Sequence, residues 1–209
     1  MRRTRLFGAT GTVLMAIGAL GAGARPVVQD PPTFGVRLLN LPSRIQTVSL
    51  TMTTTGAVMM ALAWLMLGRF FALGSRRMTR SQLDHTLLLW VVPLLIAPPP
   101  MYSKDVYSYL AQSQISANGL NPPYKVGPAP GLGLDHVFTL SVPSLWRETP
   151  APYGPLFLWV GRGGISALTG ENIVAAVLSH RVVVLLGVGM IVWAVPRLAR
   201  RCGGVAEVS

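Results

Sequence analysis

The sequence predicts an all-α protein: a polytopic bundle of transmembrane helices with one long extracytoplasmic loop that contains short helices. Three observations favour this class. Hydrophobic residues make up 51% of the 209 residues and charged residues only 12%, which leaves too little polar surface to cover a soluble core. The apolar residues fall into long blocks. Basic residues cluster beside these blocks, as topology signals do.

The formal net charge of +11 does not indicate nucleic acid, because no basic stripe is interleaved with aromatic residues. We therefore expect membrane lipid as a partner and no nucleic acid. The single cysteine, Cys202, cannot form an intrachain disulfide, which excludes a disulfide-stapled secreted fold.

The first apolar block covers residues 6–24 and follows Arg2, Arg3 and Arg5. This order predicts a membrane-crossing helix with a cytoplasmic N-terminus. A secretory signal peptide is the alternative, because residues 22–24 resemble a cleavage site. The chain emerges outside under both interpretations.

Two further helices are predicted at residues 48–68 and 84–99, the first of them after a proline-rich loop at residues 25–47. A dense arginine cluster follows the 48–68 helix and places residues 69–85 in the cytoplasm. The 84–99 helix then returns the chain to the outside.

The last two predicted helices cover residues 155–169 and 172–196. We expect both to cross the membrane as a hairpin, which would leave the C-terminal arginines outside. If residues 155–169 form only a half-helix, these arginines lie inside, as the charge rule prefers. The sequence does not decide the side of the C-terminus.

The outer loop, residues 100–154, is too long for a simple connection. Its prolines and tyrosines predict a folded loop at the membrane interface. Asp105 follows the membrane exit and opens a predicted short helix that ends near Ile115, with Ser103 as its N-cap.

Asp105 is the candidate catalytic residue, because the positive end of this helix keeps its carboxylate ionised. Helical spacing would place Tyr102, Tyr109 and Gln112 on the same face, which makes them candidate substrate-binding residues. Such a carboxylate can act as a general base or a cation ligand. Alternatively, Asp105 only stabilises the helix end.

Arg181, inside an apolar block, is a further substrate-binding candidate through a lipid phosphate; the alternative is a structural or topological role. Asp135 and His136 lack a third ligand at suitable spacing, so we expect no metal site, and a divalent cation has no support. We expect the adjacent side chains of Arg147 and Glu148 to form an ion pair at the surface. No cofactor is evident, because nucleotide-binding glycine loops and serine-nucleophile motifs are absent from the sequence.

Two segments, PPPMYSKDVYSYLAQSQISANGLNPPY and TPAPYGPLFLWVGRGGISALTGENIVAAVLSHR, resemble the first part of the polyprenyl-phosphate-mannose-dependent mannosyltransferases of actinobacteria. In particular, they are similar to the alpha-(1→6)-mannosyltransferases that build the mannan of lipomannan and lipoarabinomannan in mycobacteria. The resemblance implies a GT-C fold in the cell membrane, with Asp105 as the base outside the cytoplasm. It also implies polyprenyl-phosphate-mannose as donor and a growing mannan as acceptor.

Members of this family are much longer than 209 residues. The resemblance therefore implies the N-terminal portion of a truncated enzyme, which we expect to be inactive alone. The alternative is a non-catalytic integral membrane protein, such as a transporter fragment or an assembly partner.

Overall fold

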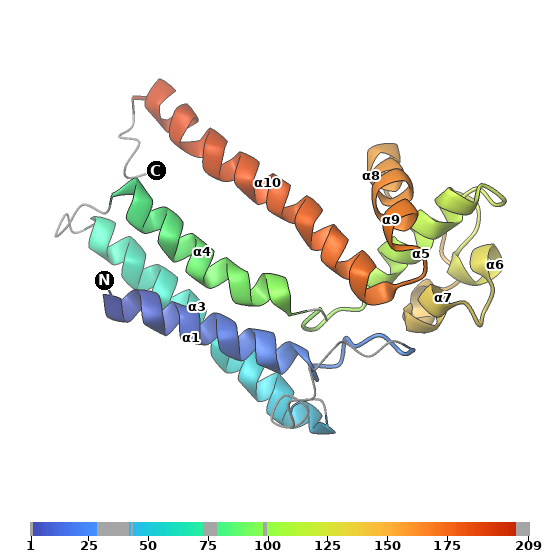
Figure 1. Ribbon diagram of the computed structural model, residues 1–209, viewed down its shortest axis with the longest axis horizontal. Coiled ribbons are helices and arrows are strands. Elements are labelled where there is room, and N and C mark those ends of the chain that lie inside the picture. Colours follow the sequence, from blue (N-terminus) through green and yellow to red (C-terminus); the bar gives the residue numbers. More distant parts are fainter. Residues whose placement is uncertain (1, 29–41, 43, 73–78, 98–99, 204–209) are drawn as a thin grey trace.

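The structure, a computed structural model, describes residues 2–28, 42, 44–72, 79–97 and 100–203. Every regular element in these residues is helical, which confirms the all-α class. The long helices lie together, and the short helices gather at one end of them (Figure 1). Most of the 25–47 loop, the 76–77 arginine pair and the end of the predicted 84–99 helix fall outside the described residues.

The long helices are α1 (Arg2–Ala19), α3 (Gln46–Ala72), α4 (Arg80–Ile96) and α10 (Ile173–Arg201). The short elements that follow α4 are α5 (Asp105–Asn118), α6 (Pro128–Leu132), α7 (Val137–Ser141), η1 (Ser144–Trp146), α8 (Pro155–Val160), the π-helical η2 (Gly161–Ser166) and α9 (Ala167–Thr169).

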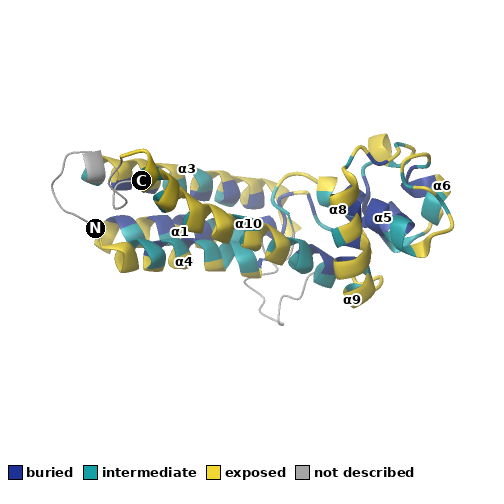
Figure 2. Ribbon diagram, turned by 90° about the horizontal axis from the view of Figure 1, so that it is seen from above, coloured by how far each residue is buried: buried dark blue, intermediate teal, exposed yellow. Residues whose placement is uncertain are grey.

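Two of the described helices are long and apolar enough to cross a membrane, at Gln46–Phe70 and Ile173–Arg201. Both expose large apolar side chains: Trp64 and Met190 are each 66% exposed (Figure 2). Lipid would cover such surfaces, which soluble monomers rarely present. These helices indicate a membrane protein.

The other predicted crossings do not meet the same criterion. Helix α1 begins at Arg2 and includes three arginines among its 18 residues. Helix α4 has only 17 residues, whereas about 20 are needed to span the hydrocarbon core.

Helices α1 and α3 pack closely through small residues (Figure 1). A Cβ atom added at Gly11 of α1 would lie 2.8 Å from the carbonyl oxygen of Gly56 in α3. A Cβ added at Gly18 would lie 2.8 Å from the carbonyl oxygen of Ser49. Membrane helices use such residues to bring their backbones together, so this seam stabilises the bundle.

Helix α4 joins the bundle through its beginning and its middle. At its N-terminus, Thr79 and Gln82 form a capping box, each side chain accepting the other residue's backbone N–H at 3.3 Å. In its middle, the buried Trp90 donates its indole N–H to the carbonyl of Arg5 at 2.9 Å. This bond fixes α4 beside α1.

Residues 155–169 are helical throughout, as α8, η2 and α9, and they stand at a steep angle to α10, beside its N-terminal end (Figures 1 and 2). They contact α5, where Ile165 enters the buried cluster around that helix. The buried contacts of this segment are mainly with α5, although Phe157 of α8 also lies against the ring of His180 in α10. The predicted membrane-crossing hairpin of residues 155–169 and α10 stays a prediction.

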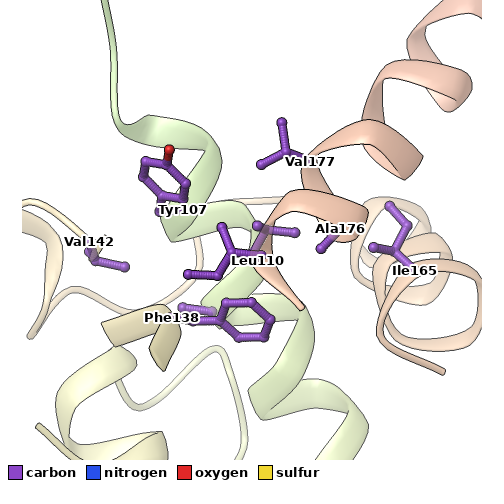
Figure 3. Close-up of a cluster of buried hydrophobic side chains, with 9 residues drawn as sticks. Tyr107, Leu110, Phe138, Val142, Ile165, Ala176 and Val177 are labelled. Carbon is purple, nitrogen blue, oxygen red and sulfur yellow. The ribbon is translucent and has the colours of Figure 1, made fainter. Parts of the chain in front are cut away.

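The short helices share a hydrophobic core around α5 (Figure 3). Its members include Tyr107 and Leu110 of α5, Phe138 of α7 and Ala176 of α10. Because the core draws on both the 100–154 segment and the start of α10, it fixes the orientation of α5 relative to the long helices.

Tyr107 also links this core to the segment that follows α1. It is fully buried, and its hydroxyl donates to the carbonyl of Ala24 at 2.6 Å. Burial raises the pKa of Tyr107 well above its ordinary value, so the hydroxyl keeps the proton that it donates. Nearby, the backbone N–H of Val27 donates to Ser141 Oγ at 3.1 Å.

Candidate functional site

Helix α5 presents Asp105 in its first turn, as predicted from the sequence. The N-cap is Lys104, one residue after the predicted Ser103, and its side chain makes no capping bond. Ser103 Oγ nevertheless accepts the backbone N–H of Asp105 at 3.1 Å. The helix continues to Asn118, beyond the predicted end near Ile115, and stops where Gly119 adopts a left-handed φ of 67°.

The exposed Asp105 stands at the edge of a cavity of about 190 Å³, which we call the Asp105 cavity. One wall is a single face of α5, formed by Asp105, Ser108, Tyr109 and Gln112 at the spacing of helical neighbours. The opposite wall comes from the segment before α8 and consists of Trp146, Thr149, Pro150, Pro152 and Tyr153.

Two buried polar atoms in this lining have no hydrogen-bond partner among the described residues: Ser108 Oγ and Gln112 Oε1. Gln112 is only 2% exposed, and its Nε2 donates to the carbonyl of Thr149 at 2.9 Å. That bond fixes the amide across the cavity. An unsatisfied buried polar atom costs about 1–3 kcal/mol, so these two atoms lower the stability of the helix face that lines the cavity.

Aromatic rings pack against one another at the cavity lining. Tyr109 and Tyr153 meet edge to face with ring centroids 5.0 Å apart, and each also contacts Phe157 of α8. Phe157 in turn lies 6.0 Å from the ring of His180 in α10. Burial, with smaller contributions from Tyr109 and Asp105, raises the pKa of Tyr153 to about 12. Its hydroxyl is therefore protonated and neutral at physiological pH.

The structure thus brings three of the sequence-predicted residues together: Asp105, Tyr109 and Gln112. Tyr102 precedes α5, is 53% exposed and is not part of the lining. Tyr102 does not lie on the predicted shared face, because α5 begins at Asp105, three residues after it.

Arg181 lies in a different place. Its Nη1 donates to the carbonyls of Leu94 and Leu95 at 2.9 and 3.4 Å, in the last turn of α4. Beside it runs an apolar groove of about 320 Å³ between α1, α4 and α10, which we call the apolar groove; its lining includes Ala19, Met101 and Arg181. Arg181 therefore joins α10 to the end of α4 at this groove.

The remaining polar candidates serve local structure. His136 is the N-cap of α7, accepting the N–H of Phe138 at 3.2 Å, and its Nε2 lies 3.5 Å from Glu171. The described residues contain no cluster that could hold a metal ion. Arg147 donates to the carbonyls of Leu140 and Val142 at the end of α7, in place of the predicted pair with its neighbour.

Sequence reasoning missed the wall opposite α5. Trp146, Thr149 and Tyr153 follow Gln112 by more than thirty residues, and nothing in their local pattern indicates which helix they face. Ser108 could have been found, because it lies three residues after Asp105 on the same helix face.

Comparison with known proteins gives consistent matches along the chain. The family model described as "Alpha-(1->6)-mannopyranosyltransferase, N-terminal domain" matches residues 5–209. Over all 209 residues, the chain is 86% identical to a probable alpha-(1→6)-mannopyranosyltransferase of Mycolicibacterium smegmatis, of which it covers 36%. It is 84% identical to an alpha-(1→6)-mannopyranosyltransferase of Mycobacterium tuberculosis, of which it covers 34%.

A more distant relative is alpha-(1→6)-mannopyranosyltransferase B of Corynebacterium glutamicum. The identity is 37%, across 98% of this chain and 35% of the relative. The chain thus spans about a third of the length of these relatives. No solved structure matches it.

Proposed function

The chain belongs to the alpha-(1→6)-mannopyranosyltransferase family, in the region of its N-terminal domain, and from this membership we propose that Asp105 is the catalytic base of a membrane mannosyltransferase. A hydroxyl of a growing alpha-(1→6) mannan, as in lipomannan or lipoarabinomannan, attacks the anomeric carbon of the mannose on polyprenyl-phosphate-mannose. The glycosidic C–O bond forms, the bond from that carbon to the phosphate oxygen breaks, and Asp105 takes the hydroxyl proton. With a beta-linked donor this is an inversion, which needs no covalent intermediate.

The observation that carries this proposal is the composition of the Asp105 cavity. The carboxylate of Asp105, the polar residues Ser108 and Gln112, and three aromatic residues line one hollow. Its volume of about 190 Å³ lies below the roughly 300–1,000 Å³ of pockets that bury whole drug-sized ligands, so it suits a single sugar ring. Gln112 and Tyr109 are the proposed contacts to that sugar.

For the donor, we place the lipid tail in the apolar groove. The groove lies among long helices whose exposed surfaces are apolar, so a tail can enter from the lipid without crossing water. Arg181 holds the end of α4 beside this groove, and through it the segment that leads to Asp105. We therefore assign Arg181 a positioning role toward the donor.

The arginines of the long helices support one orientation of the bundle in the membrane. Arg5, Arg69, Arg80 and Arg200 all lie near the same ends of the long helices, away from α5 (Figure 1). The positive-inside rule favours the cytoplasm for that end. The N-terminus and the end of α10 would then be cytoplasmic, and α5 to α9 would lie outside the cell membrane.

A chimera tests the catalytic assignment. This chain replaces the matching 209 residues of the M. smegmatis relative, and transfer of labelled mannose to mannan is measured in membranes. We expect Asp105→Asn to lower the transfer rate by roughly 10²–10⁴-fold, the usual contribution of a general base. Asp135→Asn, on an exposed turn of the same body, is the matched control and should leave the rate unchanged. Equal rates in the two variants would favour a non-catalytic role for Asp105.

A further inference from the structure

The two walls of the Asp105 cavity differ in chemistry. The α5 wall carries the polar residues Asp105, Ser108 and Gln112. The opposite wall carries Trp146, which is the last residue of η1 and is 42% exposed. A hollow with hydrogen-bonding groups on one wall and an exposed aromatic residue on the other suits an amphipathic ligand.

Trp146 differs from the other two aromatic residues of this lining. The rings of Tyr109 and Tyr153 pack edge to face against each other, and both also contact Phe157. Within the described part of the chain, the indole of Trp146 takes part in none of the contacts between aromatic rings. Its surface is therefore not used for packing against another ring.

The backbone around Trp146 is held in place. Its N–H donates to the carbonyl of Pro143 at 2.9 Å, and its own carbonyl accepts the N–H of Thr149 at 3.3 Å. The carbonyl of Thr149 in turn accepts the side-chain amide of Gln112 in α5, which fixes this turn across the cavity. The side chain of Arg147 donates to backbone carbonyls at the end of α7. Trp146 thus offers its indole to a ligand from an ordered backbone, and a preformed surface loses little entropy on binding.

A pyranose ring has the shape and chemistry that match these two walls. Its hydroxyl groups lie around the rim, whereas its faces carry C–H groups that pack well on an aromatic ring. We propose that Trp146 is the stacking residue for the acceptor mannose and that it positions the attacking hydroxyl in front of Asp105. This inference rests on the proposed mannose transfer. The acceptor is favoured over the donor because a ring beside the base must present a hydroxyl, whereas the donor mannose presents its anomeric carbon.

Binding of alpha-(1→6)-mannobiose to the full chain in neutral detergent micelles tests the stacking contact. Mannitol is the comparison probe, because it has hydroxyl groups but no ring face. The fluorescence of Trp146 is obtained as the difference between the native chain and Trp146→Phe. We expect mannobiose to shift this emission to shorter wavelength and to protect it from quenching by acrylamide, because a stacked sugar displaces water from the indole.

Affinity is measured separately, by equilibrium dialysis of radiolabelled mannobiose. Trp146→Leu should weaken binding roughly tenfold, the effect of losing one good aromatic contact. Trp146→Phe keeps a ring face and should weaken it less. Trp159→Leu is the matched control: Trp159 is 70% exposed in α8 and does not line the Asp105 cavity, so affinity should be unchanged.

Kinetics in the chimera separate this inference from the catalytic assignment. Trp146→Leu should raise the KM for the acceptor roughly tenfold and leave the KM for the donor unchanged. Asp105→Asn should lose transfer but still bind mannobiose with the same fluorescence shift, so each proposal can fail without the other. Four results would overturn the stacking role: no fluorescence shift with mannobiose, an equal shift with mannitol, an equal loss of affinity in Trp159→Leu, or a rise in the donor KM alone.

Discussion

Replacing Gly11 with alanine tests whether the seam between α1 and α3 holds the bundle together. The added Cβ would lie 2.8 Å from the carbonyl oxygen of Gly56 and 3.1 Å from the backbone nitrogen of Met60. Ordinary contacts of a Cβ atom begin at 3.4 Å. Backbone atoms cannot rotate away, so the two helices must separate locally by about 0.6 Å, the shortfall at the Gly56 oxygen.

A gap of this size has a calculable cost. A radial gap of roughly 0.5–1 Å forfeits a quarter to a half of the dispersion energy of each atom pair, which is itself about 0.1–0.2 kcal/mol. This loss at each close contact of the seam adds to the strain at Gly11, and overpacking of this kind costs about 1–3 kcal/mol in protein cores. We therefore expect Gly11→Ala to lower the free energy of unfolding by about 1–3 kcal/mol.

The assay is unfolding of helix, followed by circular dichroism while sodium dodecyl sulfate is titrated into mild detergent micelles. Gly68→Ala in α3 is the matched control, because nothing lies within 4 Å of a Cβ built at that position. Alanine there should be neutral or stabilise by up to about 1 kcal/mol through its higher helix propensity. If Gly11→Ala proves as stable as Gly68→Ala, the close packing of α1 on α3 is wrong.

Three further changes test the site and its supports. Gln112→Leu removes one hydrogen bond and one unsatisfied polar atom together, so it should change the unfolding midpoint little. It should nevertheless raise the KM of the chimera for the acceptor roughly tenfold. Tyr153→Phe should remove the step near pH 12 in the ultraviolet titration that reports tyrosinate formation. Because the pKa of Tyr153 in the folded protein exceeds the ordinary value of 10, the stability that its protonated hydroxyl contributes is present below pH 10. That stability is lost as the pH rises through about 12. Arg181→Gln should destabilise the bundle by about 1.5–3 kcal/mol through loss of the charged bond to Leu94, whereas Arg197→Gln, at an exposed side chain, should not.

Local pattern predicted much of the fold. Apolar blocks indicated the long helices, and the position of Asp105 after a serine indicated the start of α5. Helix starts depend on a few neighbouring residues, so they can be predicted from the sequence. The boundary at Ser103 was misplaced by one residue because the serine caps the helix from just outside it.

Contacts between distant segments were not predictable. The amide of Gln112 reaches Thr149, 37 residues away, and no spacing rule connects the two. Residues 155–169 had the composition of a crossing helix, but their placement depends on the buried surface that α5 offers to Ile165. Arg147 likewise donates to backbone carbonyls at the end of α7, and its position next to Glu148 in the sequence does not predict these bonds.

The central claim is that Asp105 lies on the extracytoplasmic side of the membrane, and cysteine labelling tests it most directly. Tyr102→Cys, in a Cys202→Ser background, places one exposed thiol near Asp105 without touching the Asp105 cavity. In intact cells, a membrane-impermeant maleimide should label this thiol and should not label Cys202 of the native sequence, which lies at the opposite end of α10. Labelling of Cys202 with protection of residue 102 would contradict the account.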